Sequence, residues 1–101
     1  MPPITESAPN QEEIFDKLKS IPNWDRNENA LIRIQEFPTY LMALSFVYAL
    51  GQVADKHDHH PDIMMKYKTV TIRFSTHSEN KITDLDFKMA VVAEKVIGTF
   101  C

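Results

Sequence analysis

The sequence is 101 residues long, which is the size of one domain. Hydrophobic residues make up 44% of it and charged residues 25%, as in an average globular domain. The formal net charge of −3 excludes the basic surface that nucleic acids and anionic lipids require. The longest apolar-rich segment, residues 40–54, is too short and too mixed to span a bilayer. We therefore expect no membrane partner and no direct contact with nucleic acid.

Cys101 is the only cysteine, so the fold needs no internal disulfide, which fits a reducing compartment. No apolar stretch follows a basic start, so no secretory signal is visible. A cytoplasmic location is expected, with the nucleus as a second location if the source is eukaryotic.

The first part of the chain is predicted to be a tail followed by a helix. Residues 1–9 contain three prolines and no periodicity, which predicts a flexible tail before a single domain over residues 10–101. Asn10 is a suitable N-cap for a helix that runs to about Ser20.

A short strand is expected to begin at Trp24, with a turn at residues 25–29 and a second strand over residues 30–37, where side chains alternate. A long helix then starts at Pro38-Thr39 and continues to about His57. Its apolar residues lie on several faces, so it should be covered on several sides.

The second half repeats the strand-strand-helix outline. Strands are predicted over residues 62–66 and 69–75, joined by a tight turn at Tyr67-Lys68. Thr83 then caps a final helix that runs to about Gly98, with Asp86 as a short-armed partner in a capping box. This order predicts an α+β fold, a four-stranded antiparallel sheet with three helices packed on one face.

All four histidines fall between positions 57 and 77, and three of them lie within the run Asp55-Lys56-His57-Asp58-His59-His60-Pro61. Histidine exchanges protons near neutral pH, and a carboxylate can fix its tautomer and orientation. Pro61 ends the helix before His59 and His60, which should then point to opposite sides of an extended segment. The predicted hairpin should bring His77 back to this corner. The pattern is typical of a proton-transfer site.

Two other interpretations of the cluster stay open on the residues alone. Three close histidines with aspartates could bind zinc, although their spacing is not the usual i, i+4 pair and no cysteine assists. The run could also be a solvated turn. For His57, at the C-terminus of a helix, the solvated interpretation is preferred.

The sequence resembles the pterin-4a-carbinolamine dehydratases from about Trp24 through the last helix. The family signature joins an acidic residue, a His-His-Pro triplet, an aromatic residue, a further histidine and an Asp-Phe or Asp-Leu pair. In this sequence they are, in order, Asp55, His59-His60-Pro61, Tyr67, His77 and Asp86-Phe87. Every spacing fits, and the triplet Ser75-Thr76-His77 matches as well.

The resemblance implies an enzyme that removes water from 4a-hydroxytetrahydropterin, giving the quinonoid dihydropterin and recycling the pterin cofactor of aromatic amino acid hydroxylases. The family needs no metal, and pterin is the substrate. The C4a hydroxyl leaves with a proton from a general acid while N5 loses its proton to a base. Some animal members also bind a homeodomain transcription factor as a dimerisation cofactor, so a non-catalytic or second binding role remains an alternative.

By the same resemblance, His59, His60 and His77 form the acid–base set. His60 and His77 are the first choices for proton transfer, and His59 binds and assists. The residues expected to bind or border the pterin are Asp55, Asp58, Pro61, Ser75, Thr76, Ser78 and Trp24.

Three positions depart from the family pattern. Asp55 is shorter than the glutamate common there, Ser78 replaces a glutamate of some members, and Ile63 replaces a frequent aromatic. Family members form dimers or tetramers, and a homodimer or homotetramer is expected here. The apolar long helix and a regular strand over residues 69–75, taken as a sheet edge, would provide the contacts.

Overall fold

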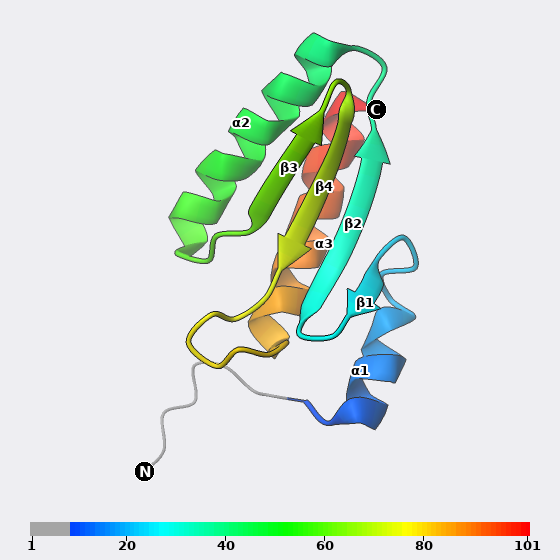
Figure 1. Ribbon diagram of the computed structural model, residues 1–101, viewed down its shortest axis with the longest axis vertical. Coiled ribbons are helices and arrows are strands. Elements are labelled where there is room, and N and C mark those ends of the chain that lie inside the picture. The colour runs from blue at the N-terminus through cyan, green and yellow to red at the C-terminus, as the bar shows by residue number, and fades with distance from the viewer. Residues whose placement is uncertain (1–8) are drawn as a thin grey trace.

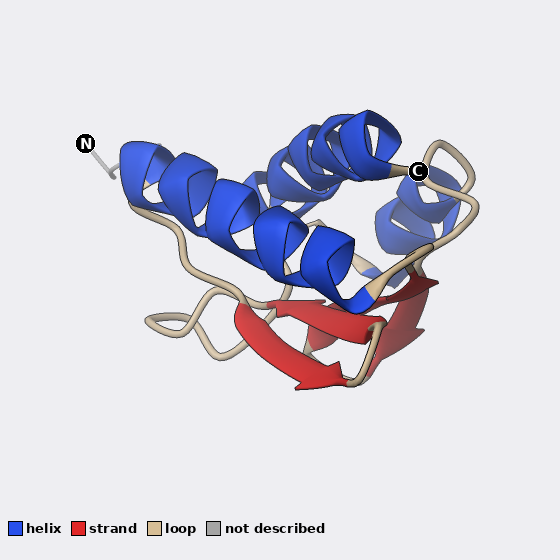
Figure 2. Ribbon diagram, turned by 90° about the horizontal axis from the view of Figure 1, so that it is seen from above, coloured by secondary structure: helices blue, strands red, loops and turns tan. Residues whose placement is uncertain are grey.

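A computed structural model describes residues 9–101, so the tail predicted over residues 1–9 lies outside the described residues except for Pro9. The elements are α1 (Gln11–Leu18), β1 (Asp25–Asn27), β2 (Ala30–Glu36), α2 (Tyr40–His57), β3 (Asp62–Lys66), β4 (Thr69–Phe74) and α3 (Asp84–Phe100). The strands form one antiparallel sheet in the order β1-β2-β4-β3 (Figure 1). Figure 2 shows the helices on one face of this sheet. The predicted α+β class and element order are confirmed.

The helices begin where short polar side chains can cap them. Asn10 and Glu13 form a reciprocal capping box at the start of α1, and the Thr39 hydroxyl accepts a hydrogen bond from the Met42 N–H at the start of α2. The predicted ends of the helices differ slightly, because α1 stops at Leu18 and α3 continues to Phe100. None of the helices within residues 9–101 has both the length and the apolar character needed to cross a bilayer.

Two expectations about the strands are wrong. The segment 25–29 is not a turn throughout, because Asp25–Asn27 pairs with β2 and only residues 28–29 make the turn, with Glu28 at a φ of 55°. All three side chains of β1 are exposed, so no apolar alternation marks the strand. In addition, the strand predicted over residues 69–75 is not an edge. As β4 it lies between β2 and β3, so β1 and β3 are the edge strands.

The core lies between the helices and one face of the sheet. Along β4, Val70, Ile72 and Phe74 are fully buried, while the alternate residues are partly exposed. From α2, Phe46 and Leu50 pack into the same cluster, joined by residues of α3 such as Met89 and Ala93. This packing fixes the positions of the two long helices relative to β4, and so the positions of the groups at their ends.

Candidate active site

The ends of four elements meet at one end of the molecule: the C-terminus of α2, the start of β3, the end of β4 and the start of α3 (Figure 1). The β3–β4 hairpin turns at Tyr67-Lys68 as predicted, and its register places Asp62 opposite Arg73 and Lys66 opposite Thr69. The segment that follows β4 therefore returns beside the segment that precedes β3. The histidines of the predicted acid–base set lie on these two segments.

The C-terminus of α2 determines how the two adjacent histidines diverge. Asp58 caps the helix in the left-handed conformation, with φ 51° and ψ 41°. The His59 N–H still bonds to the Ala54 carbonyl at 3.1 Å, after which Pro61 prevents further helix. As a result the His59 side chain turns into the protein, where it is 8% exposed, and His60 remains at the surface.

His59 is paired with a carboxylate from α3. Its Nε2 lies 2.6 Å from Oδ1 of Asp86, which is fully buried. Because a carboxylate only accepts hydrogen bonds, Nε2 carries the proton of this bond. Within residues 9–101 no hydrogen bond joins Nδ1 of His59 to another group, and the residue as a whole is 8% exposed. Asp86 therefore holds the ring through Nε2, and Nδ1 is the ring nitrogen left for a ligand.

Asp86 is itself held by two groups from the segment before α3 and the end of β4. Its Oδ2 accepts hydrogen bonds from the Thr83 backbone N–H at 2.9 Å and from the Thr76 hydroxyl at 2.8 Å. The Thr76 and Thr83 hydroxyls also bond to each other at 2.7 Å. All three residues are buried with these polar groups hydrogen-bonded, which fixes the carboxylate in one orientation.

His60 forms a second imidazole–carboxylate pair, which is open to water. Its Nε2 lies 2.7 Å from Oδ1 of Asp55 on the last turns of α2, and the two side chains are 57% and 79% exposed. The shorter aspartate thus reaches the imidazole at this position. The two histidines differ in environment, since one is fixed by a buried carboxylate and the other is accessible and loosely held.

His77 lies in a tight loop between β4 and α3. A bridge between Thr76 and Lys81 closes this loop, and the His77 carbonyl accepts a hydrogen bond from the Asn80 N–H at 3.3 Å. The histidine is exposed. It follows directly after Thr76, whose hydroxyl bonds to the same carboxylate as His59. The loop is thereby tied to the His59 corner, as the predicted hairpin requires.

The residues predicted to bind the pterin divide into surface and buried groups. Asp58 and Ser78 are exposed, and Pro61 is partly exposed beside the histidines. Ser75 is buried, as is Thr76, whose hydroxyl is committed to Asp86.

Trp24, which is predicted to border the pterin, lies in the core. It is 3% exposed, and its indole N–H donates to a carboxylate oxygen of Glu94 on α3. The side chain is therefore part of the core and does not reach the surface at which the histidines lie.

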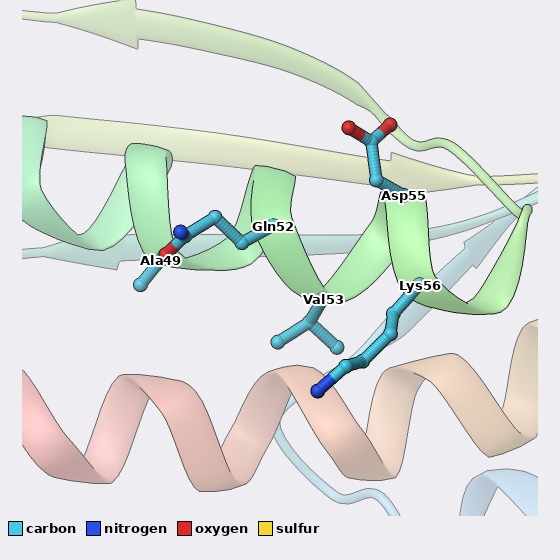
Figure 3. A pocket seen from close by; sticks show the side chains of 5 residues that line it. All are labelled: Ala49, Gln52, Val53, Asp55 and Lys56. Atoms are coloured by element: carbon cyan, nitrogen blue, oxygen red, sulfur yellow. The ribbon is translucent and has the colours of Figure 1, made fainter.

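Concave surface near the histidines lies along α2. One open depression of about 550 Å³ is lined by Tyr48, Gly51, Gln52, Asp55 and His60. A second, of about 570 Å³, is lined only by residues of α2 (Figure 3). In Figure 3 Val53 and Lys56 point toward α3, whereas Asp55 points away from it. Apart from His60, every residue that lines these two depressions belongs to α2.

Asp86 is absent from the predicted set of pterin-site residues, although it touches His59 and organises Thr76 and Thr83. Its position three residues after Thr83 marks it as a helix-capping residue, and it also occupies the last position of the family signature. Its place between Leu85 and Phe87 is a further signal, because an aspartate amid apolar residues needs a partner when it is buried. Within residues 9–101, no group of three or more His, Cys, Asp or Glu is arranged to hold a metal ion.

Known proteins are similar to this chain over most of its length. Residues 7–96 match the family model described as Pterin 4 alpha carbinolamine dehydratase. A candidate pterin-4-alpha-carbinolamine dehydratase of Mycolicibacterium smegmatis is 36% identical over 81 residues, which cover 80% of this chain and 86% of the relative. A candidate of the same name from Sulfolobus acidocaldarius is 34% identical over 86 residues, covering 85% and 94% of the two chains.

Solved structures show the same fold. The transcriptional coactivator/pterin dehydratase of Brucella melitensis superposes with a TM-score of 0.83 at 30% identity, covering 87% of this chain and 96% of that one. A pterin dehydratase-like RuBisCO assembly factor of the alpha-carboxysome shares the fold, with a TM-score of 0.62 at 17% identity over 74% and 87% of the two chains. From the family match and these relatives, the chain belongs to the pterin-4-alpha-carbinolamine dehydratase family.

Proposed function

We propose that this protein dehydrates 4a-hydroxytetrahydropterins to quinonoid dihydropterins by histidine acid–base catalysis, without a metal or other cofactor. The observation that carries the proposal is the pairing of two adjacent histidines with separate carboxylates, His59 with Asp86 and His60 with Asp55, at the end of the molecule where His77 returns. Family membership supplies the substrate class.

The reaction needs one proton delivered and one removed. The C4a–O bond breaks as the hydroxyl takes a proton from a general acid and leaves as water, and N5 gives its proton to a base as the C4a=N5 double bond forms. We assign the two transfers to His60 and His77, which are exposed and free to approach a ring. His59, held at Nε2 by Asp86, offers Nδ1 as a hydrogen-bond acceptor beside the pterin.

The test is turnover of 4a-hydroxytetrahydropterin, followed by the absorbance of the quinonoid product, in wild-type protein and in a triple variant with alanine at the three histidines. Wild-type protein should exceed the uncatalysed rate by orders of magnitude, and the triple variant should not. Equal rates in the two proteins would overturn the proposal. Treatment with a chelator should leave the wild-type rate unchanged, and loss of activity that zinc restores would contradict the metal-free mechanism.

We also infer that the protein forms a homodimer or homotetramer through the outer face of α2. Five large apolar side chains on this helix are between 40% and 71% exposed, and four of them fall on one side of it by the 3.6-residue period, namely Tyr40, Leu41, Leu44 and Tyr48. A contiguous apolar face of this kind is uncommon on a monomer. A second copy placed there would also cover the open depression beside His60. Sedimentation at micromolar concentration should show a multiple of the chain mass, and a monomer would contradict the inference.

A second function is favoured by one comparison. The Brucella melitensis relative is described as a transcriptional coactivator as well as a pterin dehydratase. The same exposed face of α2 would serve a transcription-factor partner in this chain. A stable complex recovered with a transcription factor by a protein that has no dehydratase turnover would favour this role. A cytoplasmic location stays a prediction from the single cysteine.

A further inference from the structure

The bond to Asp86 leaves the orientation of the His59 ring incompletely determined. A hydrogen bond at Nε2 fixes the position of one ring atom, 2.6 Å from the carboxylate. The plane of the imidazole can still tilt about that contact, because the torsion of an aromatic ring about its Cβ–Cγ bond is broad. Any tilt changes the direction in which Nδ1 points. A second contact is needed to fix that direction.

Phe74, the last residue of β4, provides this contact. Its ring lies parallel to the His59 imidazole, with an interplanar angle of 5° and a centroid separation of 5.9 Å. This is the offset-stacked arrangement that aromatic pairs prefer. Phe74 is fully buried, so it cannot itself touch a substrate at the surface. Its contact with His59 therefore acts only through the imidazole.

Phe74 is supported in turn by its other neighbours in the core. The Trp24 ring lies 6.1 Å from the Phe74 ring, and its indole N–H donates to Oε1 of Glu94 at 2.7 Å. The same oxygen accepts a hydrogen bond from Nε of Arg33 at 2.6 Å, from a side chain that is 9% exposed. The Glu94 carboxylate of α3 thus binds both the Trp24 indole and the buried Arg33 guanidinium of β2. These bonds hold Trp24 in place against the phenyl ring.

We propose that Phe74 is a positioning residue for His59, backed by Trp24 and its Glu94 anchor. Asp86 fixes the ring nitrogen, and the aromatic stack fixes the ring plane. The two contacts together determine where Nδ1 points. The catalytic consequence rests on the proposed dehydratase function, whereas the ordering of the imidazole does not.

The test compares Phe74→Leu with a matched control, Phe46→Leu. Phe46 is also fully buried and also stacks on an aromatic ring, that of Phe37 at 4.8 Å, but no aromatic contact links it to His59. The first readout is the exchange rate of the His59 Nε2 proton with water, measured by NMR on free protein. We expect about tenfold faster exchange in Phe74→Leu and wild-type exchange in the control, because only the first loosens the imidazole.

The second readout is steady-state turnover of 4a-hydroxytetrahydropterin. Phe74→Leu should lower kcat about 3- to 10-fold, the factor that corresponds to a lost aromatic stack. KM should change less than about twofold, since misalignment of the His59 imidazole affects the transition state more than substrate binding. The control should keep wild-type kcat at a similar loss of stability in urea.

A milder variant keeps the test decisive if Phe74→Leu does not fold. Trp24→Phe retains an aromatic neighbour but loses the donor to Glu94, and it should shift both readouts in the same direction by about two- to threefold. Proton exchange and kcat that match between the Phe74 and Phe46 variants would overturn the proposal. Absence of turnover in wild-type protein would overturn the dehydratase function alone, and proton exchange would still decide the role of Phe74.

Discussion

Replacement of Asp86 by asparagine keeps the size of the side chain. It leaves only one of the two terminal atoms able to accept a hydrogen bond. Oδ2 of Asp86 accepts a hydrogen bond from the Thr83 backbone N–H at 2.9 Å, and this donor cannot rotate away. The amide oxygen of the variant must therefore remain there. Its NH₂ group then faces Nε2 of His59, where the wild-type structure has an acceptor. Two donors cannot share this contact, so the imidazole proton should move from Nε2 to Nδ1.

The exchange of tautomers turns Nδ1 from a hydrogen-bond acceptor into a donor, and Nε2 loses its hydrogen bond to the carboxylate. A hydrogen bond to a charged group contributes about 1.5–3 kcal/mol, which corresponds to a fall in kcat of about 10- to 150-fold. Stability should fall by no more than about 1–2 kcal/mol, since the amide oxygen still caps α3. Steady-state turnover, urea unfolding and the ¹⁵N spectrum of His59 measure the three quantities. Turnover within about threefold of wild type, with the proton still on Nε2, would refute this reasoning.

Three other variants probe the exposed pair, the α2 cap and the oligomer. Asp55→Asn should lower turnover only about two- to fivefold in the same assay, because the pair that Asp55 forms with His60 is exposed and water competes for its hydrogen bond. A loss as large as that of Asp86→Asn would contradict this difference. Thr39→Ala removes the N-cap of α2 and should cost about 1 kcal/mol of unfolding free energy in urea, with turnover unchanged; a fall in kcat would show that the cap affects the site. The double variant Leu41→Lys, Tyr48→Glu should sediment as a monomer, and an unchanged oligomer would place the interface elsewhere.

Much of the fold can be predicted because its elements carry local signals. Alternation of Val70, Ile72 and Phe74 marks β4, and the Thr39 cap with Pro61 after the C-terminus delimits α2. Strand β1 carries no such signal, since its three polar residues are exposed and it exists only through pairing with β2. The order of strands is also a long-range property. For that reason local pattern predicts the pairing of β4 with β3 but not the central place of β4 in the sheet.

In the candidate site, too, some features follow from local sequence and others from long-range packing. The divergence of His59 and His60 follows from a helix stop at Pro61, and the return of His77 follows from a hairpin, both of which are local features. The pairing of His59 depends instead on packing between distant elements. His59 and Asp86 are 27 residues apart, and only the packing of α3 against α2 and β4 brings them together. The stack of Phe74 on His59 depends on the same packing.

The three histidines should surround a bound pterin if they form the acid–base set. A crystal structure of the protein with an unreactive reduced pterin tests this claim most directly. We expect the ring at the end of the molecule where α2 and β4 terminate, with His60 and His77 within about 3 Å of its polar atoms and Nδ1 of His59 facing it. A pterin bound on another surface, such as the helix-free face of the sheet, with the three imidazoles uncontacted, would contradict the claim.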